Sequence, residues 1–303
     1  MPHAPPGARW ASAYHADRGC AALPDRRPFR ARCGGAAGAM ARGADLRQGS
    51  IMSRSLARAL HGMARIATAV LRPERRASTL ALLHEATLQV VEVPTSAGVL
   101  RVLCPSNRAL HDPQGFGRDE PETVAWIEGL PADAVFWDIG ANIGLYALFA
   151  ARRGLRVSAF EPSAQSFAAM TRSAEANGLT IDAFCLAFAE GRGIARLNMA
   201  SSEAGHSMHS ITGPAARFSQ AVPAISVDAF VADFGATPPT HIKLDVDGIE
   251  PAILRGAAAT LAGTVREVLV EIEGEAAQAI PGFLAGLGFA EIAGSGRNRL
   301  FRR

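Results

Sequence analysis

The sequence predicts an α/β fold: a mostly parallel sheet with helices on both faces and an antiparallel last strand. Three observations predict it. Strand and helix patterns alternate from residue 134 onward, a glycine turn joins the first strand to its helix, and acidic residues follow successive strands. Parallel neighbours need crossover helices, which cover both faces of the sheet. The two β-rich runs that close the chain, Phe289–Ile292 and Arg299–Arg302, predict the antiparallel end.

Residues 88–303 are predicted to form this domain, starting with a hairpin of Leu88–Val93 and Val99–Cys104, because a Pro-Thr-Ser-Ala-Gly turn signal separates two β-rich runs. Strands are expected at short runs rich in apolar residues: Ala134–Trp137, Arg156–Phe160, Ile181–Leu186, Thr240–Val246 and Glu267–Ile272. Helices are expected where the apolar spacing is helical: Glu120–Gly129, Leu145–Ala151, Ala164–Ala176, Asp228–Phe234, Glu250–Leu261 and Ala276–Leu287. The segment Arg192–Pro223 is expected to be the least regular part.

The first 50 residues lie outside this pattern. They are rich in Ala, Gly, Pro and Arg without periodicity, and such a composition cannot bury enough apolar surface to fold. We expect a disordered leader, or translated upstream sequence of a GC-rich bacterial genome with Met40 or Met52 as the start. A transit peptide is the rival interpretation, because the segment is Arg-rich and poor in acids.

Residues 51–87 are predicted to be a basic amphipathic helical segment. Between Met52 and Arg76, apolar residues recur at steps of three and four while arginines fall elsewhere on the helical wheel. The helix docks either on the catalytic domain or a second subunit, or on an anionic membrane as a peripheral contact. The sequence leaves the oligomeric state open.

The distribution of charge and the spacing of the cysteines limit which classes of partner and which cellular compartment are expected. Residues 1–76 contain 14 Arg and 4 acidic residues, whereas the remainder contains 17 basic and 24 acidic residues. The mildly acidic remainder disfavours nucleic acid as a partner. The four cysteines include no Cys-x-x-Cys pair, which fits a reducing, cytoplasmic location. No apolar run is long enough to cross a bilayer.

The turn after the first core strand contains Asp138, Gly140, Asn142 and Gly144. Glycines there permit positive φ and close approach of a ligand at the positive end of a helix, although an ordinary βα turn can also contain two glycines. A dinucleotide fingerprint would have its second glycine where Asn142 stands. Asp138 would repel a pyrophosphate but suits an ammonium or sulfonium group. The loop therefore predicts a cationic, amino-acid-like ligand.

The next strand ends in Glu161, 21 positions after Gly140. A carboxylate there accepts hydrogen bonds from the hydroxyl groups of a ribose. The two features together describe a nucleoside joined to a charged amino-acid tail.

Three linked motifs between about Arg118 and Gly274 resemble the FkbM family of S-adenosylmethionine-dependent methyltransferases. They are Asp138-x-Gly-x-Asn-x-Gly, Ala159-Phe-Glu-Pro, and Ile242-Lys-Leu-Asp-Val-Asp-Gly-Ile-Glu followed by Leu254-x-Gly-Ala. The third motif has Asp247 where the family usually has Glu. The resemblance implies a Rossmann-like class I methyltransferase that uses S-adenosyl-L-methionine, most often to methylate a hydroxyl oxygen. It also implies a cofactor contact for Glu122, whose alternative is a solvated first-turn carboxylate favoured by the helix dipole.

The candidate catalytic residues are Asp245, Asp247 and Lys243. Asp245 and Asp247 lie on a strand-to-helix turn beside the cofactor loop, where open α/β sheets bind ligands, and an alcohol needs a base to take its proton. Lys243 is the single lysine of the chain and is expected to orient them, or else to form a structural ion pair. The two carboxylates could instead hold a divalent metal, stabilise the sulfonium or cap the following helix.

The acceptor is assigned to the polar segment Gly205–Ser210, with His206, Ser207 and His209 as substrate residues. A metal site is disfavoured because no third ligand accompanies the two histidines. We expect O-methylation of a hydroxyl on a small molecule, sugar or glycan. The alternatives are an NAD(P)-dependent Rossmann dehydrogenase and a noncatalytic membrane-binding or partner-binding protein with a degenerate fold.

Overall fold

The computed structural model describes residues 42–199, 201, 203–205, 218–274 and 276–303. The chain divides into two compact units, Met1–Arg72 and Pro73–Arg303, and each is described by itself. Most of the predicted leader lies outside the described residues. The predicted substrate residues His206, Ser207 and His209 lie outside them too.

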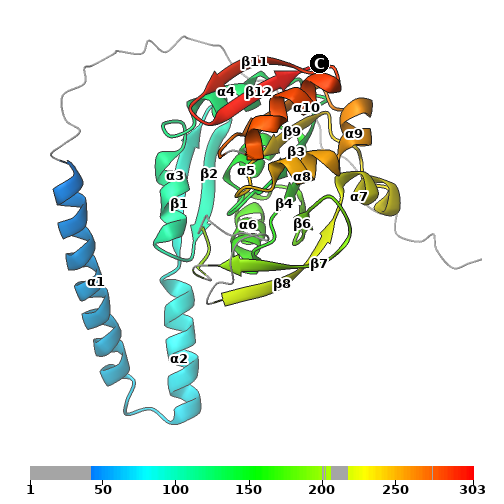
Figure 1. The fold of residues 1–303 in the computed structure, drawn as a ribbon. Coiled ribbons are helices and arrows are strands. Elements are labelled where there is room, and N and C mark those ends of the chain that lie inside the picture. Colours follow the sequence, from blue (N-terminus) through cyan, green and yellow to red (C-terminus); the bar gives the residue numbers. More distant parts are fainter. Residues whose placement is uncertain (1–41, 200, 202, 206–217, 275) are drawn as a thin grey trace, which may run out of the picture. The chain divides into compact units, whose positions relative to one another are not determined.

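In the first unit, helix α1 spans Arg42–Ala67, so it begins inside the segment 1–50 that we expected to lack structure (Figure 1). Its apolar side chains Leu56, Leu60 and Met63 are each more than half exposed. The helix predicted to run on to Arg76 is interrupted, and α2 begins separately at Pro73 and ends at Ala86. Proline explains the break, since it disfavours helical backbone in the residue before it and fits the first helical position.

The second unit is built on a seven-stranded sheet with the order β11-β12-β10-β9-β3-β4-β5. Its five parallel strands are β3 (Val135–Ile139), β4 (Arg156–Phe160), β5 (Asp182–Phe184), β9 (His241–Leu244) and β10 (Glu267–Glu271). Strand β12 (Asn298–Arg302) is antiparallel to β10, and β11 (Ala290–Ser295) is antiparallel to β12. The predicted mostly parallel sheet with an antiparallel last strand is confirmed.

Alternate residues of the central strands pack into two separate cores, one on each face of the sheet. Phe136 belongs to the core that holds α4 (Pro121–Gly129), α5 (Leu145–Arg152), α6 (Ala164–Asn177) and the hairpin of β1 (Gln89–Thr95) with β2 (Gly98–Cys104). Trp137 belongs to the core that holds α7 (Val227–Phe234), α8 (Glu250–Arg255), α9 (Ala258–Gly263) and α10 (Ile280–Gly286). The remaining short helices are η1 (Arg108–Leu110), α3 (His111–Gly115) and η2 (Ala276–Ala279). Helices on both faces are therefore confirmed.

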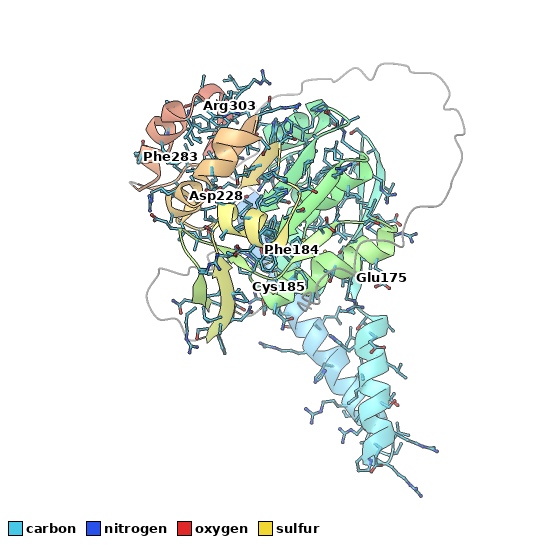
Figure 2. The ribbon with its side chains drawn as sticks, turned by 90° about the vertical axis from the view of Figure 1, so that its right-hand side faces the viewer. Glu175, Phe184, Cys185, Asp228, Phe283 and Arg303 are labelled. Carbon is cyan, nitrogen blue, oxygen red and sulfur yellow. The ribbon has the colours of Figure 1, made fainter. Side chains whose placement is uncertain are left out.

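One helix predicted as continuous is divided in two. Glu250–Leu261 forms α8 and α9, because the backbone leaves the helical conformation at Ala257, with φ −112° and ψ 8°. Gly256 before it packs closely on Ala189, where a Cβ would lie 2.5 Å from the carbonyl oxygen. The carboxylate of Asp228, labelled in Figure 2, accepts hydrogen bonds from the backbone N–H groups of Ala259 and Thr260. These bonds join α7 to the start of α9. Neither contact is visible in a local pattern.

The expected irregularity of Arg192–Pro223 is wrong at both ends of that segment. Strand β7 (Gly193–Met199) pairs antiparallel with β8 (Phe218–Ile225), which also pairs with β6 (Ala187–Phe188). The pair is stabilised by a small core of its own, in which Leu197, Met199 and Val222 are buried. Within the described residues, no helix is both long and apolar enough to cross a membrane.

Candidate active site

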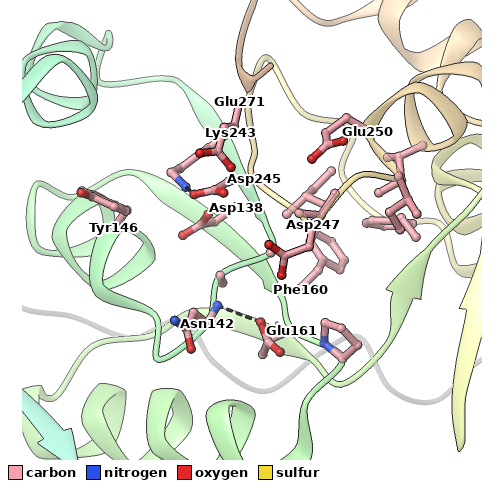
Figure 3. A pocket seen from close by; sticks show the side chains of 18 of the residues that line it. Asp138, Asn142, Tyr146, Phe160, Glu161, Lys243, Asp245, Asp247, Glu250 and Glu271 are labelled. Atoms are coloured by element: carbon pink, nitrogen blue, oxygen red, sulfur yellow. Dashed lines mark hydrogen bonds and ion pairs between the residues drawn. The ribbon is translucent and has the colours of Figure 1, made fainter. Parts of the chain in front are cut away.

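A cavity of about 840 Å³ opens at the edge of the sheet where the parallel strands end. Its walls come from the segments that follow β3, β4, β9 and β10, together with residues of α3 and α5, the residues before α4 and the turn between β11 and β12 (Figure 3). The carboxyl ends of parallel strands share one edge of a sheet, so residues far apart in the sequence meet there. The predicted glycine loop, Glu161 and the Asp245–Asp247 turn all reach this cavity.

The two glycines of the loop have structural roles. Gly140 has φ +85°, and a Cβ there would lie 1.8 Å from the backbone oxygen of Asp245. Gly144 has φ +84° and precedes α5, where a Cβ would lie 2.4 Å from the side chain of Met170. Gly140 lines the cavity, and the positive φ of Gly144 shapes the turn that leads into α5.

Asn142 holds the loop to two other segments. It is the single non-glycine residue with positive φ among the described residues, at 51°. Its backbone N–H donates to Oε2 of Glu161 at 2.8 Å, and its Nδ2 donates to Oδ2 of Asp112 at 3.1 Å. Its Oδ1 is buried and finds no hydrogen-bond partner among the described residues, which leaves an acceptor for a ligand.

Glu161 lies at the cavity with 6% of its surface exposed. Its Oε1 accepts the N–H of Ser163 at 2.7 Å while Oε2 accepts that of Asn142. Burial raises the pKa of Glu161 to about 7, although the two backbone N–H groups oppose the rise. The wall beside it is apolar and consists of Phe160, Leu186, Ala187, Phe188 and Leu197.

Asp138 is buried at the cavity with 1% of its surface exposed. Neither carboxylate oxygen has a well-formed hydrogen bond within the described residues. Burial raises its pKa to about 6, and the nearby ammonium of Lys243 limits the rise. A buried carboxylate without donors is energetically costly, so it marks a position for a cationic or donating ligand group.

Lys243 is aligned with Asp138 on the neighbouring strand and is equally buried, with 3% exposed. Its Nζ lies 2.5 Å from Oδ2 of Asp245 and 5.1 Å from the ring centroid of Tyr146. Burial alone would lower the pKa of Lys243, but Asp245, Asp138 and Glu120 outweigh burial and raise it. Ile242 and Leu244, its neighbours on the strand, point the other way and pack into the core of the opposite face.

Asp245 is coupled to Glu271, which the sequence interpretation missed. Burial raises the pKa of Asp245, but Lys243 outweighs burial and the pKa is lowered. Burial and the charge of Asp245 raise the pKa of Glu271 to about 8. Arg297 Nη2 lies 2.9 Å from Oε1 of Glu271. The available signal was an acidic residue near the end of the predicted strand Glu267–Ile272. Register across the sheet places Glu271 level with Glu161, since Val270 and Phe160 are aligned through β9 and β3.

Two residues that the sequence grouped with this site, Asp247 and Glu122, have other neighbours than expected. Asp247 lines the cavity, but its charge acts on Glu161 and Glu250, and Figure 3 shows its carboxylate turned toward Glu161. Glu122 does not line the cavity. Its Oε1 accepts from Asn298 Nδ2 at 3.0 Å, at a second cavity of about 440 Å³. Glu120, the residue before α4, lines the main cavity, and the Nδ2 of Asn298 donates to both Glu120 and Glu122. The cofactor contact expected for Glu122 stays a prediction.

Further carboxylates reach the cavity from before the first core strand, namely Asp112, Asp119 and Glu120. Burial raises the pKa of Asp112 to about 6. Within the described part of the chain, no group of three or more His, Cys, Asp or Glu is arranged to hold a metal ion.

The chain is similar to several known proteins. The hexuronic acid methyltransferase AglP of Haloferax volcanii is 28% identical over 146 residues, which are 48% of this chain and 59% of that protein. The chain thus spans less than two thirds of the length of this relative. The FkbM methyltransferase of Methylobacillus flagellatus has 16% identity and a TM-score of 0.41, over 58% of this chain and 45% of that one. The magnesium protoporphyrin IX methyltransferase of Synechocystis has 15% identity and a TM-score of 0.38, over 65% and 82%.

The methyltransferase FkbM domain matches residues 138–290, which is just over half of the 303 residues. The matched segment begins at the buried carboxylate of the glycine loop and contains the Glu161 and Lys243–Asp245 positions of the cavity. The chain therefore belongs to the FkbM methyltransferase domain family.

Proposed function

We propose that this protein transfers a methyl group from S-adenosyl-L-methionine to a hydroxyl oxygen of a sugar or another small molecule. The observation that carries the proposal is the meeting of two carboxylate sets in one cavity: Asp138 and Glu161 beside the glycine loop, and Asp245 and Glu271 at the ends of the adjacent strands β9 and β10. The name of the H. volcanii relative supports a sugar-like acceptor.

The glycine-loop half of the cavity fits a nucleoside that carries a cationic amino-acid tail. Glu161 uses two of its acceptor positions on backbone N–H groups and keeps others for ribose hydroxyls. Asp138 offers two buried oxygens whose one donor contact, with the backbone of Ala147, is not a well-formed hydrogen bond, and an ammonium would satisfy them. The apolar wall at Phe188 suits a base, and the cofactor supplies an electrophilic methyl group on a sulfonium sulfur.

The other half of the cavity handles the proton of the acceptor hydroxyl. Asp245 and Glu271 share a hydrogen bond, and the charge of Asp245 helps burial to raise the pKa of Glu271 to about 8, so we assign one shared proton to these two carboxyl groups. A base with a pKa near the working pH contributes about a hundredfold or more to the rate. Lys243 positions Asp245 through the 2.5 Å ion pair. Asp247 is turned toward Glu161, so we assign the proton to Asp245 with Glu271.

Methyl transfer also requires the acceptor oxygen to lie within about 3–3.5 Å of the methyl carbon and in line with the sulfur. Incubation with methyl-labelled S-adenosylmethionine and hydroxyl acceptors, followed by identification of the labelled atom, tests the proposal. The label is expected on a hydroxyl oxygen. Label on nitrogen, on a carboxylate or on the protein itself would contradict the O-methylation.

A thermal-shift experiment separates this proposal from the two alternative functions. S-adenosylhomocysteine is expected to raise the melting temperature, whereas NAD(H) is expected to leave it unchanged, because a ligand stabilises only the protein that binds it. A response to NAD(H) alone would favour a dehydrogenase. No response to either would favour a noncatalytic protein.

A further inference from the structure

We infer that the acceptor carries a positive charge, as a protonated amine close to the hydroxyl that receives the methyl group, and that the cavity rejects an anionic sugar such as a hexuronate. The inference rests on the proposed methyl transfer and adds the charge class of the acceptor to it. It departs from what the name of the H. volcanii relative suggests, and the charges on the acceptor half of the cavity carry it.

The order of the strands divides the cavity into two halves. The glycine loop follows β3 and Glu161 follows β4, so the cofactor residues occupy the β3–β4 half. Strands β9 and β10 lie on the other side of β3, and the β11–β12 turn lies beyond them. The acceptor therefore enters over the ends of β9 and β10, in the half that contains Asp245, Glu271 and Arg297.

The described lining residues are strongly acidic. Ten of them are Asp or Glu, whereas two, Lys243 and Arg297, are basic. A bound S-adenosylmethionine brings one net positive charge, so the excess of carboxylates persists when it is bound. Four of these carboxylates lie at or after the ends of β9 and β10 in the acceptor half: Asp245, Glu250, Glu271 and Glu273.

Both lining cations already have carboxylate partners. Lys243 is paired with Asp245 at 2.5 Å, and Arg297 is paired with Glu271 at 2.9 Å and with Glu273. An acceptor carboxylate would have to pair with Lys243 or Arg297 in place of a protein carboxylate. The displaced protein carboxylate would then lie in the cavity without a compensating charge. A like charge brought to such a surface suppresses binding, whereas an opposite charge favours it.

Glu250 supplies an independent observation in the acceptor half. It is 3% exposed and lines the cavity from the start of α8. Its Oε1 accepts the N–H of Gly248 at 3.2 Å, but its Oε2 is buried without a partner among the described residues. Figure 3 shows its carboxylate facing the space next to Asp245 and Asp247. An ammonium group would give this oxygen both a donor and an opposite charge.

Calorimetry on the full chain loaded with S-adenosylhomocysteine tests the inference with three probes of similar shape: D-glucosamine, D-glucose and D-glucuronate. Glucosamine is expected to bind at least tenfold more tightly than glucuronate and more tightly than glucose. Equal or tighter binding of glucuronate would overturn the inference, and so would binding of none of the three. Loading with S-adenosylhomocysteine is measured first, so failure of the cofactor proposal is recognised separately.

Two variants test which carboxylates carry the preference. Glu250→Gln keeps the shape of the side chain and removes its charge, so glucosamine affinity is expected to fall at least threefold while glucose affinity is unchanged. Glu273→Gln at the more exposed rim gives the same test if the buried substitution impairs folding. The matched control is Glu291→Gln on β11, whose exposed carboxylate pairs with Arg299 away from the cavity. Equal losses for both sugars, or no loss in either variant, would overturn the assignment.

Discussion

The backbone N–H of Asn142 donates to Oε2 of Glu161 at 2.8 Å, which joins the glycine loop after β3 to the acidic residue after β4. Two features that the sequence suggested separately are thus one hydrogen-bonded unit at the cavity. Substitution of Glu161 therefore removes a ligand acceptor and a support of the loop together.

Glu161→Ala is expected to weaken cofactor binding by on the order of 1–3 kcal/mol, because ribose hydroxyls and the Asn142 N–H lose their acceptor. Calorimetry with S-adenosylhomocysteine measures the change. The control is Glu175→Ala, an exposed carboxylate on α6 labelled in Figure 2, which is expected to bind normally. Unchanged affinity in the Glu161 variant would remove this residue from the cofactor site.

Lys243 and Asp245 are expected to be energetically coupled, because each compensates a charge that the other leaves in the cavity. Lys243→Met and Asp245→Asn should each change the free energy of unfolding, and the double variant should differ from the sum by roughly 0.5–3 kcal/mol. Denaturant unfolding of the four proteins measures this coupling. Strict additivity would show that the 2.5 Å ion pair contributes nothing to stability.

The cofactor half of the site could largely be predicted from the sequence, because its markers are local. Asp138, Asn142 and Glu161 each stand in a fixed place after a recognisable strand, and the structure brings all three to one cavity. Glu271 was missed because its importance depends on β10 lying beside β9, and strand order is not a local property. Glu120 was not singled out, although it lines the cavity, because the local sequence does not show which side of a segment packs toward a cavity.

The fold shows the same division between local and tertiary information. Strand β4 was predicted with the bounds it has, since a short run rich in apolar residues ends at an acidic residue. The break between α8 and α9 was missed, because the non-helical backbone at Ala257 lies within a continuous run of helix-forming residues. The β7–β8 pair was missed because its core is formed between distant residues.

The segment before Met52 is expected to be dispensable for cofactor binding. The second compact unit begins at Pro73, and the described residues that line the cavity begin at Asp112. A chain that begins at Met52 should fold and bind S-adenosylhomocysteine like the full chain, although it lacks the first turns of α1. Circular dichroism melting and calorimetry compare the two. Insolubility or a much lower melting temperature would show that the leader is structural.

Stability without cofactor is expected to fall as the pH rises from 5.5 to 8. Burial raises the pKa of five described cavity carboxyl groups from their usual values of 3.8 or 4.5: Asp112, Asp138 and Glu250 to about 6, Glu161 to about 7 and Glu271 to about 8. A raised pKa means that the folded state binds the proton more tightly than the unfolded state. The stability from these groups is therefore complete below about pH 4 and is lost as the pH rises toward 8.

One described group opposes this trend within the window. Burial lowers the pKa of His241 below 6.5, so its contribution is lost as the pH falls. The five carboxyl groups outnumber it, and melting temperatures measured at pH 5.5, 6.5, 7.25 and 8 should decrease. Glu250→Gln should flatten the curve, because it removes one of the titrating groups. A melting temperature that is constant or rises across the window would contradict these pKa shifts.

Asp245→Asn is expected to lower kcat about a hundredfold or more while it changes affinity for S-adenosylhomocysteine much less, because it removes the negative charge at the reacting centre and keeps the shape.

In the unsubstituted protein, kcat should rise with pH through about 8, because Asp245 and Glu271 together accept the proton of the hydroxyl most readily once Glu271 is ionised. Glu271→Gln should remove that rise and leave a lower, pH-independent rate. Steady-state kinetics between pH 6 and 9 with labelled cofactor measure both effects. Normal turnover of the Asp245 variant would exclude this pair as the base, and an unaltered pH profile in the Glu271 variant would exclude proton sharing between them.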